Sequence, residues 1–136
     1  MSNKLVKKSN LGDLSYSDLG LDVRFQYLEA PYCEDGTKML FKVDDIEQYC
    51  VNNLYDPQFA DCSCIIAIRQ DGTALLNWNI KSKVDVLGAE VKVNPDNYKE
   101  IGDILFDMAM DTYGHYFAGI VILVEVKPNT YKMIEK

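Results

Sequence analysis

The clearest folding signal in this 136-residue chain is residues 64–78, CIIAIRQDGTALLNW. Two runs that favour β-structure flank Asp71-Gly72, and both of these residues tolerate the positive φ angles of a tight hairpin turn. β-branched residues such as isoleucine favour strands because their side chains pack well on a pleated surface. The segment therefore predicts an antiparallel β-hairpin.

The residues before this segment predict another hairpin and then a short helix. Residues 23–28 alternate as in a half-buried strand, and residues 38–43 would pair back on them across an Asp35-Gly36 turn. Asp44 or Asp45 would cap a helix that runs to about Leu54, because an aspartate oxygen accepts from exposed backbone N–H groups. The buried stripe of this helix would contain Ile46, Tyr49, Cys50 and Leu54.

The residues after the segment predict a strand, a long helix and two more strands. A strand would cover residues 84–93, with Gly88 as a bulge or turn. Asn94-Pro95 would start the helix, because asparagine is a favoured cap and proline suits the first helical position. Gly114 would follow its end. Residues 116–126 are apolar almost throughout, as in a strand covered on both faces, and residues 130–134 would form a final edge strand.

This order of elements, β-β-α-β-β-β-α-β-β, contains mostly hairpin links. It predicts an α+β fold in which a mostly antiparallel sheet carries two helices packed on one face. The length suits one domain. We therefore expect residues 21–136 to form a single α+β domain and residues 1–20 to form a flexible N-terminal segment.

The chain is acidic, with a formal net charge of −7. Lys4, Lys7 and Lys8 contribute +3 within the first eight residues, so the rest carries −10. A body of that sign repels phosphate backbones, which argues against direct nucleic-acid binding. No apolar run approaches the roughly 18–20 residues that span a bilayer, and the N-terminus lacks a signal-peptide pattern. We therefore expect a cytoplasmic protein that binds no membrane.

Carboxylates recur along the predicted helix 95–113 at steps of four, three, four and four residues. At these steps side chains share one helix face, so they would form an acidic ridge about 22 Å long. The Ile101 and Leu105 stripe falls on a separate face. Like charges at this spacing destabilise a helix by about 0.2–0.5 kcal/mol per pair, which favours a binding role for the ridge. Its members are Asp96, Glu100, Asp103, Asp107 and Asp111.

The ridge could also attract a metal ion. Asp103, Asp107 and Asp111 lie in line and could hold Mg²⁺ or Ca²⁺, with water completing the coordination shell. However, no glycine-rich phosphate loop or calcium-loop pattern accompanies them. We expect no metal site and no cofactor.

The cysteines and the single histidine give weaker patterns still. Cys33, Cys50, Cys62 and Cys64 could bind zinc with His115, but a single residue between Cys62 and Cys64 is too few for the usual zinc knuckle. Buried reduced thiols fit better. His115 lacks an accompanying serine or cysteine motif, so we expect no catalytic residues.

These observations predict a non-enzymatic binding protein of the inhibitor, immunity or adaptor type. The acidic ridge would mask a basic surface of a partner, such as a nucleic-acid-binding protein, by imitating phosphate charges, a device of inhibitors encoded by mobile elements. Tyr98 and Tyr113 at its flanks would supply anchor area. Two alternatives stay open: a small enzyme-like module that binds a ligand or divalent metal, and a homodimer or larger assembly formed by edge pairing of the last strands.

Overall fold

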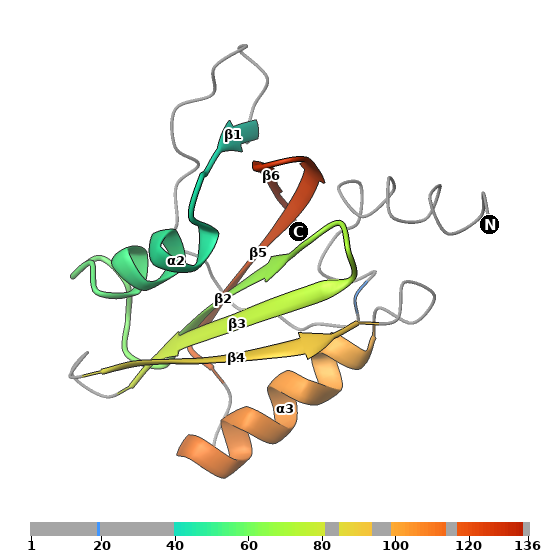
Figure 1. Ribbon diagram of the computed structural model, residues 1–136. Helices are drawn as coiled ribbons and strands as arrows, with labels where there is room; N and C mark the ends of the chain where they lie inside the picture. The colour runs from blue at the N-terminus through green and yellow to red at the C-terminus, as the bar shows by residue number, and fades with distance from the viewer. Residues whose placement is uncertain (1–18, 20–39, 81–84, 94–98, 114–116, 135–136) are drawn as a thin grey trace.

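The computed structural model describes Leu19 and residues 40–80, 85–93, 99–113 and 117–134. These residues form one six-stranded sheet and two helices (Figure 1). The helices are α2 (Ile46–Leu54) and α3 (Glu100–Tyr113). The strands are β1 (Leu40–Lys42), β2 (Ser63–Ile68), β3 (Thr73–Asn79), β4 (Val86–Lys92), β5 (Gly119–Lys127) and β6 (Thr130–Met133). Their order across the sheet is β1-β6-β5-β2-β3-β4.

β2 and β3 form the antiparallel hairpin that the sequence predicts. Gly72 in its turn has a φ of +87°, and the Asp71 side chain accepts a hydrogen bond from the Thr73 backbone N–H at 2.9 Å. β2 also pairs with β5 in parallel, whereas every other strand pairing in the described part of the chain is antiparallel. The predicted α+β class with a mostly antiparallel sheet is confirmed.

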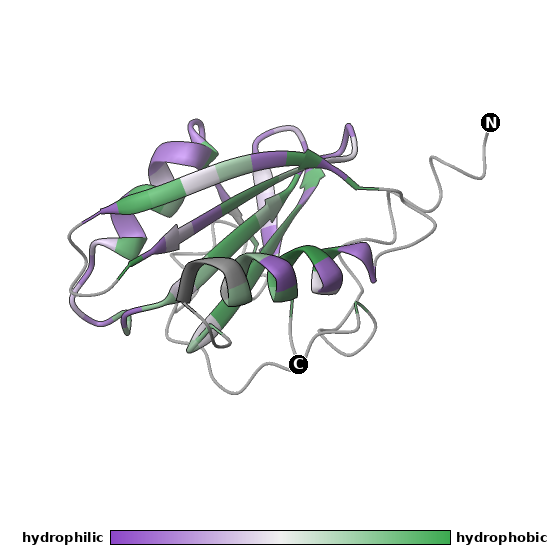
Figure 2. Cartoon of the chain, turned by 90° about the horizontal axis from the view of Figure 1, so that it is seen from below, coloured by the Kyte–Doolittle hydropathy of each residue, from purple (hydrophilic) through white to green (hydrophobic). Residues whose placement is uncertain are grey.

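Both helices pack against the sheet, but they cover opposite faces of it rather than the single face that the sequence predicts (Figure 2). Ile101 of α3 shares one buried cluster with Ile66 of β2. Ile46 of α2 shares the other cluster with Ile65 of β2. Successive side chains of a strand point to opposite faces, and β2 is buried along its whole length. A central strand of this kind needs cover on both faces.

α2 begins and ends close to the predicted limits. Asp45, and not Asp44, caps it: the Asp45 carboxylate accepts a hydrogen bond from the Gln48 backbone N–H at 3.1 Å. Along the predicted stripe, Tyr49 is half-buried, and the buried side chains are Ile46, Cys50 and Leu54. The stripe packs α2 onto the sheet.

The edges of the sheet differ from the prediction. β6 lies between β1 and β5, so the C-terminal strand is interior, because β1 covers its outer side. Within the described residues the edge strands are therefore β1 and β4. β1 therefore occupies the side of β6 that the sequence analysis considered for pairing with a second copy. The strand predicted over residues 23–28 lies outside the described residues, and β1 pairs with β6.

β4 lies within the strand predicted over residues 84–93, but Gly88 is not a bulge. The pairing with β3 is continuous, and Gly88 lies opposite Asn77. A Cβ at position 88 would lie 2.9 Å from Asn77 Oδ1. A larger residue at position 88 would therefore require the Asn77 side chain to move.

No helix within the described residues is long and apolar enough to cross a membrane.

Candidate functional site

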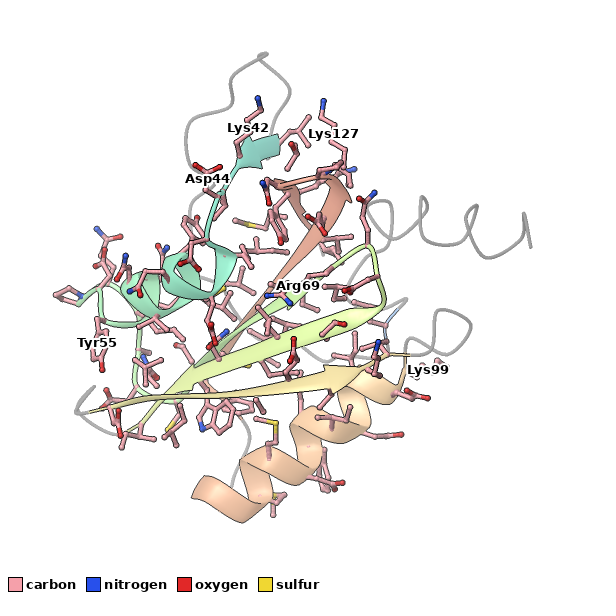
Figure 3. The ribbon with its side chains drawn as sticks, viewed as in Figure 1. Lys42, Asp44, Tyr55, Arg69, Lys99 and Lys127 are labelled. Atoms are coloured by element: carbon pink, nitrogen blue, oxygen red, sulfur yellow. The ribbon has the colours of Figure 1, made fainter. Side chains whose placement is uncertain are left out.

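The predicted acidic ridge lies partly within α3. Ile101 and Leu105 are buried against the sheet, while Asp103 and Asp107 are exposed and Glu100 is half-buried. The described helix starts at Glu100, after Lys99, whose carbonyl accepts a hydrogen bond from the Asp103 backbone N–H at 3.3 Å. Figure 3 shows Lys99 at this end of α3. α3 therefore separates an apolar face from an acidic one, as the sequence predicts.

The other predicted residues of this site are less fully described. Asp96 and Tyr98 lie outside the described residues, as does the proposed start of the helix at Asn94-Pro95. Asp111 and Tyr113 belong to α3, but their side chains lie outside the described part. The structure therefore brings together Glu100, Asp103 and Asp107 on one helix.

Phe106 and Met110 add an apolar element that the sequence analysis missed. They lie one turn apart on α3, and their side chains are 45% and 43% exposed. Neither belongs to the stripe of Ile101 and Leu105, so their helical spacing alone could have revealed them as apolar residues on the solvent side. Large exposed side chains of this type are enriched at protein interfaces.

A second candidate site is a groove of about 540 Å³ on the opposite face of the sheet. α2 forms one wall through Glu47, Gln48 and Val51, and its cap residue Asp45 extends that wall. β3 and β4 supply most of the remainder, including Asn77, Gly88 and Glu90. The sequence analysis did not find this groove, because its walls meet only through the pairing of β3 with β4 and the packing of α2.

Arg69, at the end of β2, lines the same groove, and Figure 3 shows it on the side of the sheet that carries α2. Its Nη1 lies 3.2 Å from Glu90 Oε2, and the two side chains are 33% and 57% exposed. An ion pair this exposed stabilises a protein by only about 0.2–1 kcal/mol. The pair therefore contributes little to the stability of the fold.

Asn77 lies in the wall of the groove and is only 4% exposed. Its Nδ2 is buried and has no hydrogen-bond partner within the described part of the chain. Asn79, two residues further along β3, contrasts with it. The Asn79 Nδ2 donates to the Leu54 and Ala60 carbonyls at 3.1 Å each, and its Oδ1 accepts from the Ser63 N–H at 2.8 Å.

The described cysteines have the character of core residues. Cys50, Cys62 and Cys64 are all buried. Burial, with a smaller effect of the nearby Glu47 carboxylate, raises the pKa of Cys50 to about 12. Burial likewise raises the pKa of Cys64 far above its ordinary value. A thiol that keeps its proton at neutral pH is a poor nucleophile and a poor metal ligand.

Metal ligands do not gather within the described ranges: no three His, Cys, Asp or Glu side chains there are placed to hold an ion. Cys33 and His115 lie outside those ranges.

Comparison of this chain with protein-family models, curated proteins and solved structures gives no match.

Proposed function

We propose that this protein is a non-enzymatic binding protein that docks the solvent side of α3 on a basic surface of a partner protein. The observation that supports the proposal is the combination of exposed carboxylates with exposed apolar side chains on one helix. Asp103 and Asp107 supply the charge, and Phe106 and Met110 supply the apolar area.

The two kinds of side chain have separate roles in such an interface. Carboxylates attract a basic partner over a distance and speed association. Most of the binding free energy comes from a few large side chains that lose water in the complex, a role suited to Phe106 and Met110. An acidic face that is merely solvated does not need exposed apolar residues beside its charges.

The acidic surface matches a partner that otherwise binds nucleic acid. The spaced carboxylates of α3 would take the place of phosphates in a basic groove, and release of counterions from that groove would favour the complex. The functional class is then an inhibitor, an immunity protein or an adaptor that masks the groove.

Charge reversal tests this function. Asp103→Lys with Asp107→Lys should weaken capture of a basic partner from the native host at least tenfold, because attraction becomes repulsion. The control is Asp44→Lys with Asp61→Lys, which moves the formal charge from −7 to the same −3 at exposed positions outside α3. Mass spectrometry identifies the captured protein, and binding of the purified pair is measured by calorimetry.

The apolar residues allow an independent test with the same purified partner. Phe106→Ala with Met110→Ala should raise the Kd at least tenfold while the circular dichroism spectrum stays unchanged. Equal binding by the wild-type chain and both α3 variants would exclude α3 as the docking surface. Equal weakening by the Asp44/Asp61 control would show that only net charge matters.

A further inference from the structure

The groove between α2 and β4 lies on the face of the sheet opposite α3, so the function proposed for α3 does not use it. We propose that this groove binds an extended segment of a partner protein that contains lysine or arginine, and that the segment adds to β4 as a further strand. Backbone geometry, a buried unpaired amide and charge support this assignment independently.

The backbone of β4 has hydrogen-bonding groups at the edge of the sheet. The Val93 N–H donates to the Gly72 carbonyl at 2.8 Å, and the Asp85 carbonyl accepts from the Ile80 N–H at 3.2 Å. Odd-numbered residues of β4 thus direct their backbone groups toward β3. Because this direction alternates along an antiparallel strand, even-numbered residues direct theirs outward. In the central and C-terminal parts of β4, the residues with outward backbone groups are Gly88, Glu90 and Lys92.

These outward groups border the groove. β4 is the last strand of the sheet within the described ranges, so an extended peptide can pair with it there. Gly88, near the middle of the strand, is one of the residues whose backbone groups point outward. Peptide side chains on the α2 side of the sheet would then enter the groove.

Asn77 is the polar group in the groove that the fold leaves unpaired. A buried N–H without a partner costs about 1–3 kcal/mol, whereas an apolar residue of similar size would carry no such cost. Asn79 shows that this strand can satisfy a buried asparagine through its own neighbours. Asn77 lines the groove, and because its Nδ2 is buried in the free protein, a small rotation of the side chain toward the groove would bring that N–H to a carbonyl of a bound peptide.

The charge of the groove selects a basic segment. Its lining contains the carboxylates of Asp45, Glu47 and Glu90 and a single cation, Arg69. Arg69 pairs with Glu90, and the Asp45 carboxylate caps α2. Glu47 on the wall formed by α2 therefore attracts the lysine or arginine of the bound segment.

The proposal can be tested with a fluorescein-labelled nine-residue peptide of alternating valine and lysine, by fluorescence polarisation with the full chain. We expect binding of this peptide and none of the matching valine–glutamate peptide. Methylation of alternate backbone nitrogens should weaken binding at least tenfold, because it removes the donors that pair with β4. Equal binding of the methylated peptide would overturn strand addition.

Variants of the groove locate the site. Glu47→Lys should weaken peptide binding about fivefold, whereas the matched change Asp61→Lys outside the groove should alter it less than about twofold. Asn77→Val should weaken binding about fivefold without lowering the urea midpoint of unfolding, because it removes an unpaired buried donor. Equal loss in the Glu47→Lys and Asp61→Lys variants would overturn the assignment to this groove.

Two further measurements separate this proposal from its alternatives. Asp103→Lys with Asp107→Lys should leave peptide binding within about twofold of wild type, because α3 lies on the other face. Loss of peptide binding in that variant would instead place the peptide on α3. Sedimentation velocity should show a monomer, and self-association abolished by Glu47→Lys would identify a second copy as the occupant and overturn the assignment.

Discussion

Gly88 and Asn77 are coupled across β3 and β4. Glycine in a strand is less favourable than alanine by about 0.5–1 kcal/mol, because it loses more backbone freedom on folding. At position 88 this gain is opposed, since a Cβ would lie 2.9 Å from Asn77 Oδ1 and the Asn77 side chain would have to move. The conformation of Asn77 and the residue at position 88 therefore depend on each other.

Gly88→Ala is expected to lower the free energy of unfolding by about 1–2 kcal/mol, because the added methyl group forces Asn77 to move in a closely packed sheet. Urea denaturation of the variant and the wild type measures the change. In an Asn77→Ala background, which lacks the obstructing oxygen, the same substitution should cost less than half as much. An alanine variant as stable as the wild type would show that Asn77 shifts without strain.

Asn77 and Asn79 have the same chemistry and different surroundings. Asn79 connects the end of α2 and the start of β2 through hydrogen bonds of its side chain. Asn77 faces the groove, and its Nδ2 is unpaired in the described part of the chain. The first asparagine stabilises the fold, whereas the second leaves a buried donor without a partner in the described part of the chain.

At the scale of the element, α2 depends on its cap. Asp45 Oδ1 accepts from the Gln48 N–H, which would otherwise lack a partner within the helix. Glu47 in the first turn adds a favourable interaction with the helix dipole. Because α2 forms one wall of the groove, this cap also positions Glu47.

Asp45→Ala is expected to lower the free energy of unfolding by about 1 kcal/mol, through loss of the cap. Asp44→Ala is the matched control, since it removes the same charge from an exposed neighbour that does not cap the helix, and it should change stability by less than about 0.5 kcal/mol. Chemical denaturation of the two variants gives the comparison. Equal destabilisation would mean that charge and not capping is responsible.

In α3, the spacing of residues predicts which side chains are buried and which are exposed, but it does not predict which of them form a site. The spacing of Ile101 and Leu105 correctly predicts its buried face, and the spacing of Asp103 and Asp107 correctly predicts an exposed one. The same spacing does not identify which exposed residues bind. Phe106 has a helical position on the solvent side, and the structure adds that its exposed fraction is 45%.

The stability of the whole molecule depends on pH because cysteine and tyrosine side chains are buried in it. Burial raises the pKa of Cys50 from 9.0 to about 12, and it raises the pKa values of Tyr49 and Tyr131 from 10.0 to about 12. Between about pH 9 and pH 12, the unfolded chain therefore loses protons that the folded chain keeps. The folded state then binds more protons, so its stability falls as pH rises.

We therefore expect the free energy of unfolding to be insensitive to these groups below about pH 8 and to fall from about pH 9 to pH 12. A group such as Cys50 contributes a slope of up to about 1.4 kcal/mol per pH unit. Urea denaturation at a series of pH values measures this fall, and Cys50→Ala should make it shallower. Stability that stays level to pH 11 would contradict the burial of these groups.

Local signals predicted much of the fold. The turn residues Asp71-Gly72, the capping aspartate before α2 and the continuous apolar run of β5 depend on neighbours in the chain, so each was recognisable without tertiary structure. The side of the sheet that each helix covers depends on long-range packing. For the same reason, the parallel pairing of β2 with β5 and the interior place of β6 did not follow from the pattern.

The amino-acid sequence by itself determined the elements, the α+β class and the separate acidic and apolar faces of α3, because short-range backbone preferences and side-chain periodicity act within single elements. Only the tertiary structure decided that β4 is an edge strand, that Asn77 is buried beside Gly88, and that α2 and β4 enclose a groove. Those features join residues that are distant in the chain. Their contacts arise when the whole sheet assembles and packs against its helices.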